Sequence, residues 1–240
     1  MKLIYVFHSG FVIEAADFAI LIDYYKDTGF HPHHGYVHDE LLKRESPLYI
    51  LSSHAHPDHF NKEILAWKKK KENITYIFSR DILHHRKAGE EEAVYLLKGE
   101  SYEDEKLSIK AFGSTDAGIS FLIRAEGKEI FHAGDLNNWH WKAESTPEEI
   151  AVMERDYLNE VALLQQTTTH LDLAMFPVDP RLGDDYALGA EQFIDRIHVD
   201  LFAPMHFAES YQALPSFCHY AREKETPCVC WKEKGQFVEF

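Results

Sequence analysis

Three histidines and one aspartate fall within the six positions 54–59, in the stretch LSSHAHPDHF. Because side chains at i and i+2 of an extended segment point to the same side, His54 and His56 can reach one ion. The proline that follows bends the chain, so Asp58 and His59 can turn to a second point nearby. Imidazole and carboxylate suit Zn²⁺, and without cysteine ligands Mn²⁺ or Fe²⁺ are also open. The pattern favours a loop that serves two ions over a polar loop whose histidines cap the next helix.

The elements around this loop predict one α/β domain over 1–240. The length suits such a domain, and no internal repeat, low-complexity linker or hinge interrupts the chain. Strand-like and helical segments alternate, and three apolar runs are each followed at once by histidine: LYILSSH, EIFHAGD and DLFAPMH. Polar groups at strand ends can converge at one edge of a sheet core, so we expect these histidines to share a site.

The expected strands are apolar runs that turn signals bound, and the expected helices carry apolar residues on one side. Helices are predicted at 38–45, 57–71, 80–89, 146–166, 186–197 and 210–224. Strands are predicted at 2–7, 11–15, 18–23, 47–52, 74–79, 107–114, 118–125, 128–135, 171–178, 200–207, 228–231 and 236–240. Thr146 is the expected cap of its helix, with a proline at the first helical position.

Composition restricts the partners and the compartment. The formal net charge of −15 disfavours nucleic acid, whose phosphates are held by Lys and Arg. No apolar run approaches the roughly 20 residues that span a bilayer, and the N-terminal run lacks the features of a signal peptide. Three cysteines without framework spacing fit a reducing compartment. Cys228 and Cys230 are favoured as two packed residues of a buried strand over a metal-binding or redox pair. We therefore expect a cytoplasmic protein.

The motif SSHAHPDHF resembles the H-x-H-x-D-H signature of the metallo-β-lactamase superfamily. Later motifs follow the order of that family: HAGD offers His132 and Asp135, and APMHF offers His206. The resemblance covers nearly the whole chain in element order, although only these motifs match sharply. It implies a four-layer αββα sandwich of the α/β (α+β) class, with the site at one edge of its sheets.

The resemblance also implies a complete set of metal ligands. His54, His56 and His132 would bind one divalent ion, most simply Zn²⁺. The second ion would be bound by Asp58, His59 and His206, and Asp135 would bridge both. Two such ions about 3.5–4 Å apart hold a hydroxide at neutral pH and polarise the bond under attack. Asp58 can orient this nucleophile and carry a proton to the leaving group, so Asp58 and Asp135 are the expected catalytic residues.

Within the superfamily, HSGFVIEAADFAILID resembles the opening of the branch of ascorbate-6-phosphate lactonase-like and N-acyl phosphatidylethanolamine phospholipase D-like proteins. Phe7 stands where that branch has glycine. His8 is either a substrate contact or a hydrogen-bonded turn residue. Asp23 could orient a ligand histidine through its second ring nitrogen. Flavodiiron-type relatives carry glutamate at the position of His56, so hydrolysis is favoured over oxygen reduction.

The substrate contacts are read from loops that follow strand ends. Trp139 and His140 could form a pocket wall, or the loop's aromatics could simply pack against each other. Arg181 could grip a carboxylate or phosphate, or pair with Asp184 or Asp185 on the surface. Thr115 and Asp116 are favoured as turn residues over substrate contacts. The histidine-rich loop 26–38, with His31, His33, His34 and His38, could be a lid, although solvated or supporting roles are favoured because the ligand set is already complete.

These features predict a dinuclear hydrolase that uses metal-bound hydroxide on a small-molecule ester, lactone or phosphoester, anionic ones included. A β-lactam is disfavoured because no export signal is visible. One alternative is a nucleic-acid phosphodiesterase of the same superfamily, which would need a basic groove. Another is a non-catalytic metal-binding regulatory protein with this fold. The sequence does not specify the oligomeric state.

Overall fold

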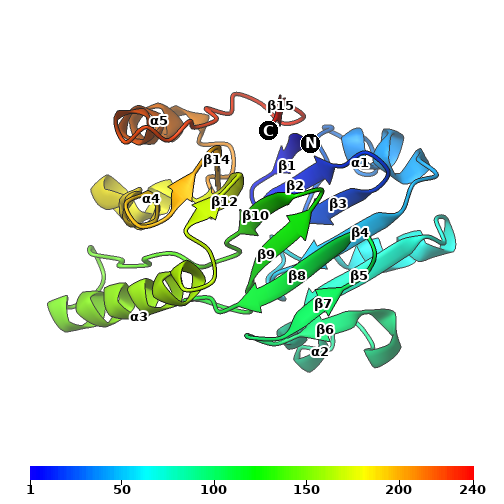
Figure 1. The fold of residues 1–240 in the computed structure, drawn as a ribbon, viewed down its shortest axis with the longest axis horizontal. Coiled ribbons are helices and arrows are strands. Elements are labelled where there is room, and N and C mark those ends of the chain that lie inside the picture. Colours follow the sequence, from blue (N-terminus) through cyan, green and yellow to red (C-terminus); the bar gives the residue numbers. More distant parts are fainter. The chain divides into compact units, whose positions relative to one another are not determined.

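Two large mixed sheets contain most of the strands in the computed structural model, which describes residues 1–240 (Figure 1). Each sheet belongs to one of two compact units, Met1–Leu97 with Trp231–Phe240 and Lys98–Cys230. Helices accompany both sheets, so the predicted mixed α/β class is confirmed. The prediction of a single domain over 1–240 stays a prediction.

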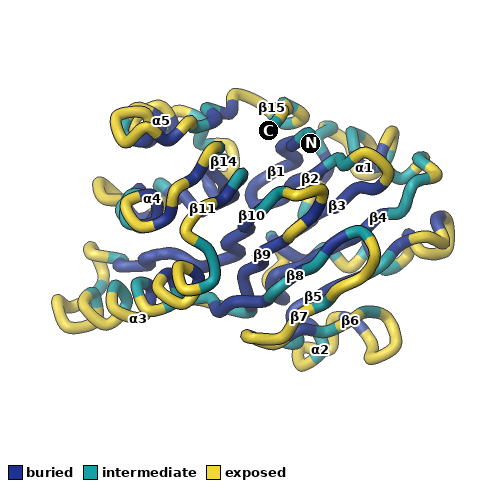
Figure 2. The backbone as a smooth tube through the Cα atoms, in the orientation of Figure 1, coloured by how far each residue is buried: buried dark blue, intermediate teal, exposed yellow.

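The sheet of the first unit combines an antiparallel half with a parallel half. Its order is β15-β1-β2-β3-β4-β5-β6; β15 to β3 pair antiparallel, and β3 to β6 pair parallel. The strands are β1 (Lys2–Phe7), β2 (Gly10–Glu14), β3 (Ala19–Ile22), β4 (Leu48–Ser52), β5 (Ile74–Ser79), β6 (Val94–Leu96) and β15 (Phe237–Glu239). Strands β3 and β4 are buried along their whole length, as their continuous apolar runs predict (Figure 2).

The helical segments of the first unit are short. They are α1 (Tyr36–Asp39), η1 (Leu41–Lys43), η2 (Lys62–Lys69), α2 (Arg80–His84) and η3 (Glu90–Glu92), where η marks a 3₁₀ helix. The helix predicted at 57–71 is therefore a 3₁₀ helix that begins later. Asn61 explains the start, because its extended backbone ends the motif loop and its side chain accepts from the Glu63 N–H at 3.0 Å. Trp67 anchors the segment edge-on against Tyr24, with ring centroids 4.9 Å apart.

The second unit is built on a six-stranded sheet of order β14-β12-β10-β9-β8-β7. Its strands are β7 (Ser101–Glu103), β8 (Leu107–Phe112), β9 (Ser120–Ala125), β10 (Lys128–His132), β12 (Leu173–Pro177) and β14 (Phe202–Met205); β11 (His170–Leu171) and β13 (His198–Val199) form a separate pair. Strands β10, β12 and β14 run parallel, so the residues that follow them emerge at the same edge. This edge receives three of the predicted site segments.

The helices of the second unit are α3 (Pro147–Gln165), η4 (Pro180–Asp185), α4 (Leu188–Ile194), η5 (Tyr211–Ala213) and α5 (Leu214–Glu223). The prediction for 146–166 is confirmed in detail. Thr146 accepts from the Glu149 N–H, and the Glu149 carboxylate accepts in return from the Thr146 N–H at 2.8 Å. Further along α3, the buried Tyr157 donates its hydroxyl to the Gly189 carbonyl at 2.6 Å.

Further details differ from the predicted elements. The apolar run 228–231 forms only an isolated bridge between Cys228 and Phe202 rather than a strand. Strands β6 and β7 were not predicted, because both are short and carry exposed residues without apolar alternation. The proline expected inside the last helix lies in the first turn of α5, where its missing N–H costs no hydrogen bond. None of the helices has the length and apolarity that crossing a membrane requires.

A carboxylate at the end of β2 connects this strand to α1 and η1. Glu14 accepts from the Tyr36 hydroxyl and the Arg44 guanidinium, and Lys2 Nζ lies 3.4 Å away. Burial alone would raise the pKa of Glu14, but the Tyr36 hydrogen bond and the charges of Arg44 and Lys2 bring it below its usual value. The ionised carboxylate therefore stabilises the fold above the unfolded pKa of about 4.3, and this contribution disappears as the pH falls through the lower folded pKa.

Replacing Glu14 with Gln is accordingly expected to lower the free energy of unfolding by about 1.5–3 kcal/mol at pH 7. Urea denaturation at pH 7 and at pH 3 measures the difference, which should shrink at the lower pH. Glu91→Gln, in the exposed η3, is the control and should leave stability unchanged. A Glu14→Gln deficit that is the same at both pH values would contradict the assignment to charge.

Candidate metal centre

The motif loop leaves β4 with its first two histidines already together. The Nε2 atom of His54 lies 2.9 Å from the Nδ1 atom of His56. Ligand atoms that share one tetrahedral zinc at about 2.0–2.1 Å lie roughly 3.3 Å apart, so little movement is needed to seat an ion. Between the two histidines, the Ala55 N–H donates to Asp81 Oδ2 at 2.8 Å, which fixes the loop backbone. The predicted convergence of His54 and His56 is present.

Asp23 orients the last histidine of the motif. Its carboxylate is fully buried and accepts from His59 Nδ1 at 2.7 Å, and also from the Ser53 N–H at 2.7 Å and hydroxyl at 2.6 Å. With its proton on Nδ1, His59 presents the lone pair of Nε2 to an ion. Asp23 adopts the left-handed backbone, φ 46°, that turns the chain after β3 toward the loop. The predicted orienting contact is therefore present in the structure.

Asp58 lies beside His8, with Asp58 Oδ2 3.3 Å from His8 Nε2. Burial alone would raise the pKa of Asp58, but the His8 hydrogen bond holds it well below its usual range. Asp58 is thus ionised at neutral pH. His8 occupies a left-handed turn, φ 58°, and its N–H donates to the Tyr5 hydroxyl at 3.0 Å. The structure places His8 next to a predicted ligand; its contact with substrate stays a prediction.

In the second unit, parallel pairing of β12 with β14 brings Asp179 and His206 to one edge. Pro177, the last residue of β12, pairs with Met205, the last residue of β14, so the two strands end side by side. His206 Nδ1 lies 2.9 Å from Asp179 Oδ2, and His206 Nε2 lies 3.3 Å from Asp135 Oδ1. One ring nitrogen of His206 is thus held by a buried aspartate, while the other faces a predicted ligand. The arrangement repeats that of Asp23 and His59.

Arg181 binds Asp179 rather than an aspartate of its own surface loop. Its Nε lies 3.0 and 2.9 Å from the two carboxylate oxygens, and Nη2 lies 2.5 Å from Oδ2. Burial alone would raise the pKa of Asp179, but the hydrogen bonds from His206 and Arg181 lower it to about 2. Arg181 therefore helps to keep the aspartate that orients His206 ionised. Its predicted role in substrate binding stays a prediction.

His132 ends β10 and is buried. Its Nδ1 accepts from the Gly134 N–H at 3.1 Å, an arrangement that leaves the proton of neutral imidazole on Nε2. Metal binding through Nε2 would therefore require the proton to move to Nδ1 and the Gly134 contact to be lost. The role of His132 as a ligand stays a prediction.

The aromatic loop after β10 is held by hydrogen bonds to backbone. Trp139 Nε1 donates to the Asp135 carbonyl at 2.8 Å, and the indole meets the His206 ring edge-on with centroids 5.4 Å apart. His140 is buried, with Nε2 3.2 Å from the Asp185 carbonyl and Nδ1 accepting from the Lys142 N–H at 3.3 Å. Trp139 thus packs directly beside the candidate ligands, whereas both ring nitrogens of His140 contact backbone. Neither residue's contact with substrate is tested.

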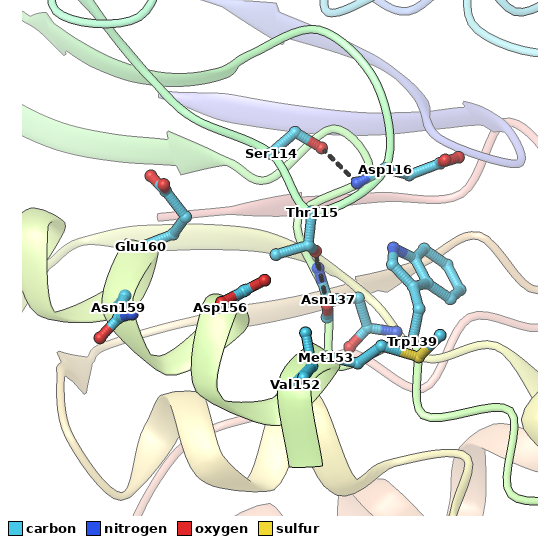
Figure 3. Close-up of a pocket in the computed structure, with 10 residues that line it drawn as sticks. All are labelled: Ser114, Thr115, Asp116, Asn137, Trp139, Val152, Met153, Asp156, Asn159 and Glu160. Carbon is cyan, nitrogen blue, oxygen red and sulfur yellow. Dashed lines mark hydrogen bonds between the residues drawn. The ribbon is translucent and has the colours of Figure 1, made fainter. Parts of the chain in front are cut away.

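A cavity of about 410 Å³ opens beside Trp139 (Figure 3). The loop after β8, the segment after Asp135 and one face of α3 enclose it. Its lining includes three acids, Asp116, Asp156 and Glu160, and contains no Lys or Arg. Thr115 closes one side by donating its hydroxyl to the Asn137 carbonyl at 2.6 Å, which agrees with its predicted role in the connection. The cavity suits neutral polar or cationic groups better than anionic ones.

The donors in each unit fit divalent metal ions. In both units a buried aspartate that follows a strand orients an imidazole, and the remaining donors are imidazole nitrogens and carboxylate oxygens. These features define the class as a metal-binding α/β protein. Residues 2–153 match the family model described as the β-lactamase superfamily domain. The chain therefore belongs to the β-lactamase superfamily, a family of metal-dependent hydrolases, and the predicted superfamily is confirmed.

Solved structures share the fold at low sequence identity. The metallo hydrolase Igni18 from the archaeon Ignicoccus hospitalis KIN4/I is 17% identical with a TM-score of 0.69, covering 100% of this chain and 98% of that one. The metallo-β-lactamase fold protein YhfI from Bacillus subtilis is 12% identical with a TM-score of 0.64, covering 100% and 98%. CmlA, a diiron β-hydroxylase from Streptomyces venezuelae, is 13% identical with a TM-score of 0.70; this chain covers 54% of its length. A comparison with curated proteins found no match.

Proposed function

We propose that this protein is a dinuclear metal-dependent hydrolase of small ester, lactone or phosphoester substrates, with anionic substrates included. Two buried aspartates carry the proposal. Asp23 holds Nδ1 of His59 and Asp179 holds Nδ1 of His206, and the family signature places a metal ligand at both histidines. Orientation by a carboxylate is the usual support of a metal-binding histidine.

The proposed ligands follow the family order. His54, His56 and His132 would bind one ion. The second would be bound by Asp58, His59 and His206, with Asp135 shared by both. When bound, the two ions would lower the pKa of a water and neutralise charge that develops in the transition state.

The protein's own residues would supply orientation and proton transfer. Asp58 is ionised at neutral pH, so its carboxylate would orient the attacking water by accepting a hydrogen bond, and it would carry a proton to the leaving group. His8 would hold the Asp58 carboxylate in place through its contact at 3.3 Å. Trp139 would exclude water from the side of His206 against which it packs.

Lactones and phosphoesters are the preferred substrates, in line with the branch of ascorbate-6-phosphate lactonase-like and N-acyl phosphatidylethanolamine phospholipase D-like proteins that the N-terminal hairpin resembles. The acidic cavity beside Trp139 would receive a neutral or cationic part of the substrate. Arg181 would meet an anionic part, because its side chain remains 61% exposed. Zn²⁺ is the proposed metal, with Mn²⁺ and Fe²⁺ as alternatives, and a cytoplasmic location is proposed from the cysteine content.

Metal analysis combined with a substrate panel tests the proposal. The purified protein should contain two divalent ions per chain and hydrolyse at least one of a generic lactone, a phosphomonoester, a phosphodiester and a thioester. Full metal occupancy without hydrolysis of any panel member would favour a regulatory metal-binding protein. Salt-sensitive binding of RNA would favour a nucleic-acid phosphodiesterase. Two bound irons with oxygen consumption would overturn the hydrolase proposal, and the diiron enzyme that shares the fold makes this control necessary.

A further inference from the structure

A second group of metal-binding side chains lies within the first unit, in and beside the loop that precedes α1. One ring nitrogen of His33, one of His38 and one carboxylate oxygen of Glu63 lie within 4.8 Å of one another. His33 Nδ1 is 3.0 Å from Glu63 Oε2, and the rings of His33 and His38 meet edge-on with centroids 5.2 Å apart. None of these three residues is among the ligands of the proposed hydrolytic site.

The separations suit a small divalent ion. Donors at about 2.0–2.1 Å from a tetrahedral zinc lie roughly 3.3 Å apart, so the His33–Glu63 pair is already close to that spacing and the third donor is within reach of a side-chain rotation. Two neutral imidazoles and one carboxylate are a donor set that zinc sites use when they keep a fourth position for water. The side chain of His33 is 68% exposed, which gives an ion access from solvent.

A buried carboxylate supports this group. Asp27 Oδ2 lies 2.8 Å from His38 Nδ1, and the same carboxylate accepts from the N–H groups of Thr28, Val37 and His38. With the proton of His38 on Nδ1, its Nε2 carries the lone pair and makes no hydrogen bond within the protein. Asn61 Nδ2 donates to Glu63 Oε1 at 3.3 Å, which leaves Oε2 directed to His33. Two of the three donors are therefore oriented in advance.

The backbone of the loop is shaped to bring His33 to the other two donors. Gly29 and Gly35 meet so closely that a Cβ on Gly29 would lie 2.3 Å from the His34 carbonyl oxygen, and one on Gly35 would lie 2.5 Å from Asp27 Oδ1. Gly35 also has φ +134°, a conformation that other residues rarely adopt. His33 has φ 62°, an uncommon value for a residue with a side chain. Such backbone conformations persist only where surrounding contacts determine them.

We propose that His33, His38 and Glu63 form a third, mononuclear zinc site that pins the loop to the start of η2. Asp27 is its positioning residue, through His38. The binding of Zn²⁺ replaces the direct His33–Glu63 contact with two bonds to one ion, and any proton on His33 is released to solvent. The group His170, His198 and Asp200 provides the internal comparison: its donors also lie within 4.8 Å of one another, but all three residues are exposed.

Zinc counting on matched variants tests this site. Wild type, His33→Gln, His38→Gln and the control His198→Gln are dialysed against the same zinc–chelator buffer, and zinc per chain is measured by elemental analysis. We expect His33→Gln and His38→Gln each to hold one zinc fewer than wild type, and His198→Gln to hold the same number. Co²⁺ added at the third equivalent should produce visible absorption bands in wild type that His38→Gln lacks. His33 is exposed, so its variant is expected to fold even if replacement of His38 disturbs packing against Trp67.

The count is a difference between variants, so it separates this site from the hydrolytic centre. Failure of the dinuclear proposal would lower the zinc content of wild type and both loop variants together and would leave the difference of one intact. Equal zinc content in wild type and His33→Gln would overturn the third site and assign the His33–Glu63 contact to an ion pair. A zinc lost in His198→Gln and retained in His38→Gln would overturn it in favour of the exposed group.

Discussion

Replacing Asp135 with alanine is expected to lower hydrolysis by at least about 10³-fold and to release metal as well. In the proposed site Asp135 is the ligand that both ions share, so its loss removes several kcal/mol of charge stabilisation. The structure supports this position: Asp135 is buried, and its Oδ1 lies 3.3 Å from His206 Nε2. Metal content by elemental analysis and activity on the substrate identified by the panel are the two measurements.

Asp172→Ala is the matched control, because this aspartate accepts from Lys128 at 2.7 Å and from the Glu129 N–H at 2.8 Å but touches no proposed ligand. It should cost stability without metal loss. Asp135→Asn separates charge from shape, since it keeps the size of the side chain and should still lose metal. Two tightly bound ions in Asp135→Ala would contradict the assignment of Asp135 as a metal ligand.

The sequence was most informative where one segment carries the whole signal. The stretch around His54 needed only the alternation of an extended loop to predict that two imidazoles converge, and the separation of 2.9 Å agrees. Strands β4, β5 and β10 were equally easy to predict, because each is a short apolar segment between turn signals. Family order then connected His132, Asp135 and His206 to the motif, and this ligand set stays a prediction; the family match covers residues 2–153.

The contact between Asp179 and His206 was harder to predict, because it depends on the pairing of strands that are distant in the sequence. Asp179 reaches His206 only through the parallel register of β12 and β14, which no local pattern specifies. Pairing with Asp184 or Asp185 was one of two alternatives for Arg181, whose guanidinium instead binds Asp179, two positions before it. The group around His38 was missed as a candidate site, although the density of histidines in its loop was visible. Glu63 lies 25 positions beyond His38, so sequence spacing gave no sign of their contact.

The role of Asp23 was predictable from its place at a strand end. Replacing it is expected to produce the second large effect. Asp23→Asn should weaken the metal affinity of the centre by about 10–100-fold, because a carboxylate that orients a ligand histidine typically contributes that much. His59 Nδ1 and the Ser53 hydroxyl both donate to Oδ2, at 2.7 and 2.6 Å, and the Ser53 N–H donates to Oδ1 at 2.7 Å. The single oxygen of the amide cannot accept from both sides. A further loss of about 2–3 kcal/mol in the free energy of unfolding is expected from these unsatisfied buried groups.

Isothermal titration of the metal-free protein with Zn²⁺ measures the first effect, and urea denaturation of the same sample measures the second. Asp81→Asn is the control within the same loop, since an asparagine oxygen can still accept from the Ala55 N–H that Asp81 binds at 2.8 Å. It should keep the wild-type affinity. A variant Asp23→Asn that lost stability and kept its affinity would mean that Asp23 only fastens Ser53. Loss of affinity in Asp23→Asn alone would identify the Asp23 carboxylate as the group that prepares the site for metal. It acts directly on His59 and through Ser53, whose hydroxyl lies 3.0 Å from His54 Nδ1.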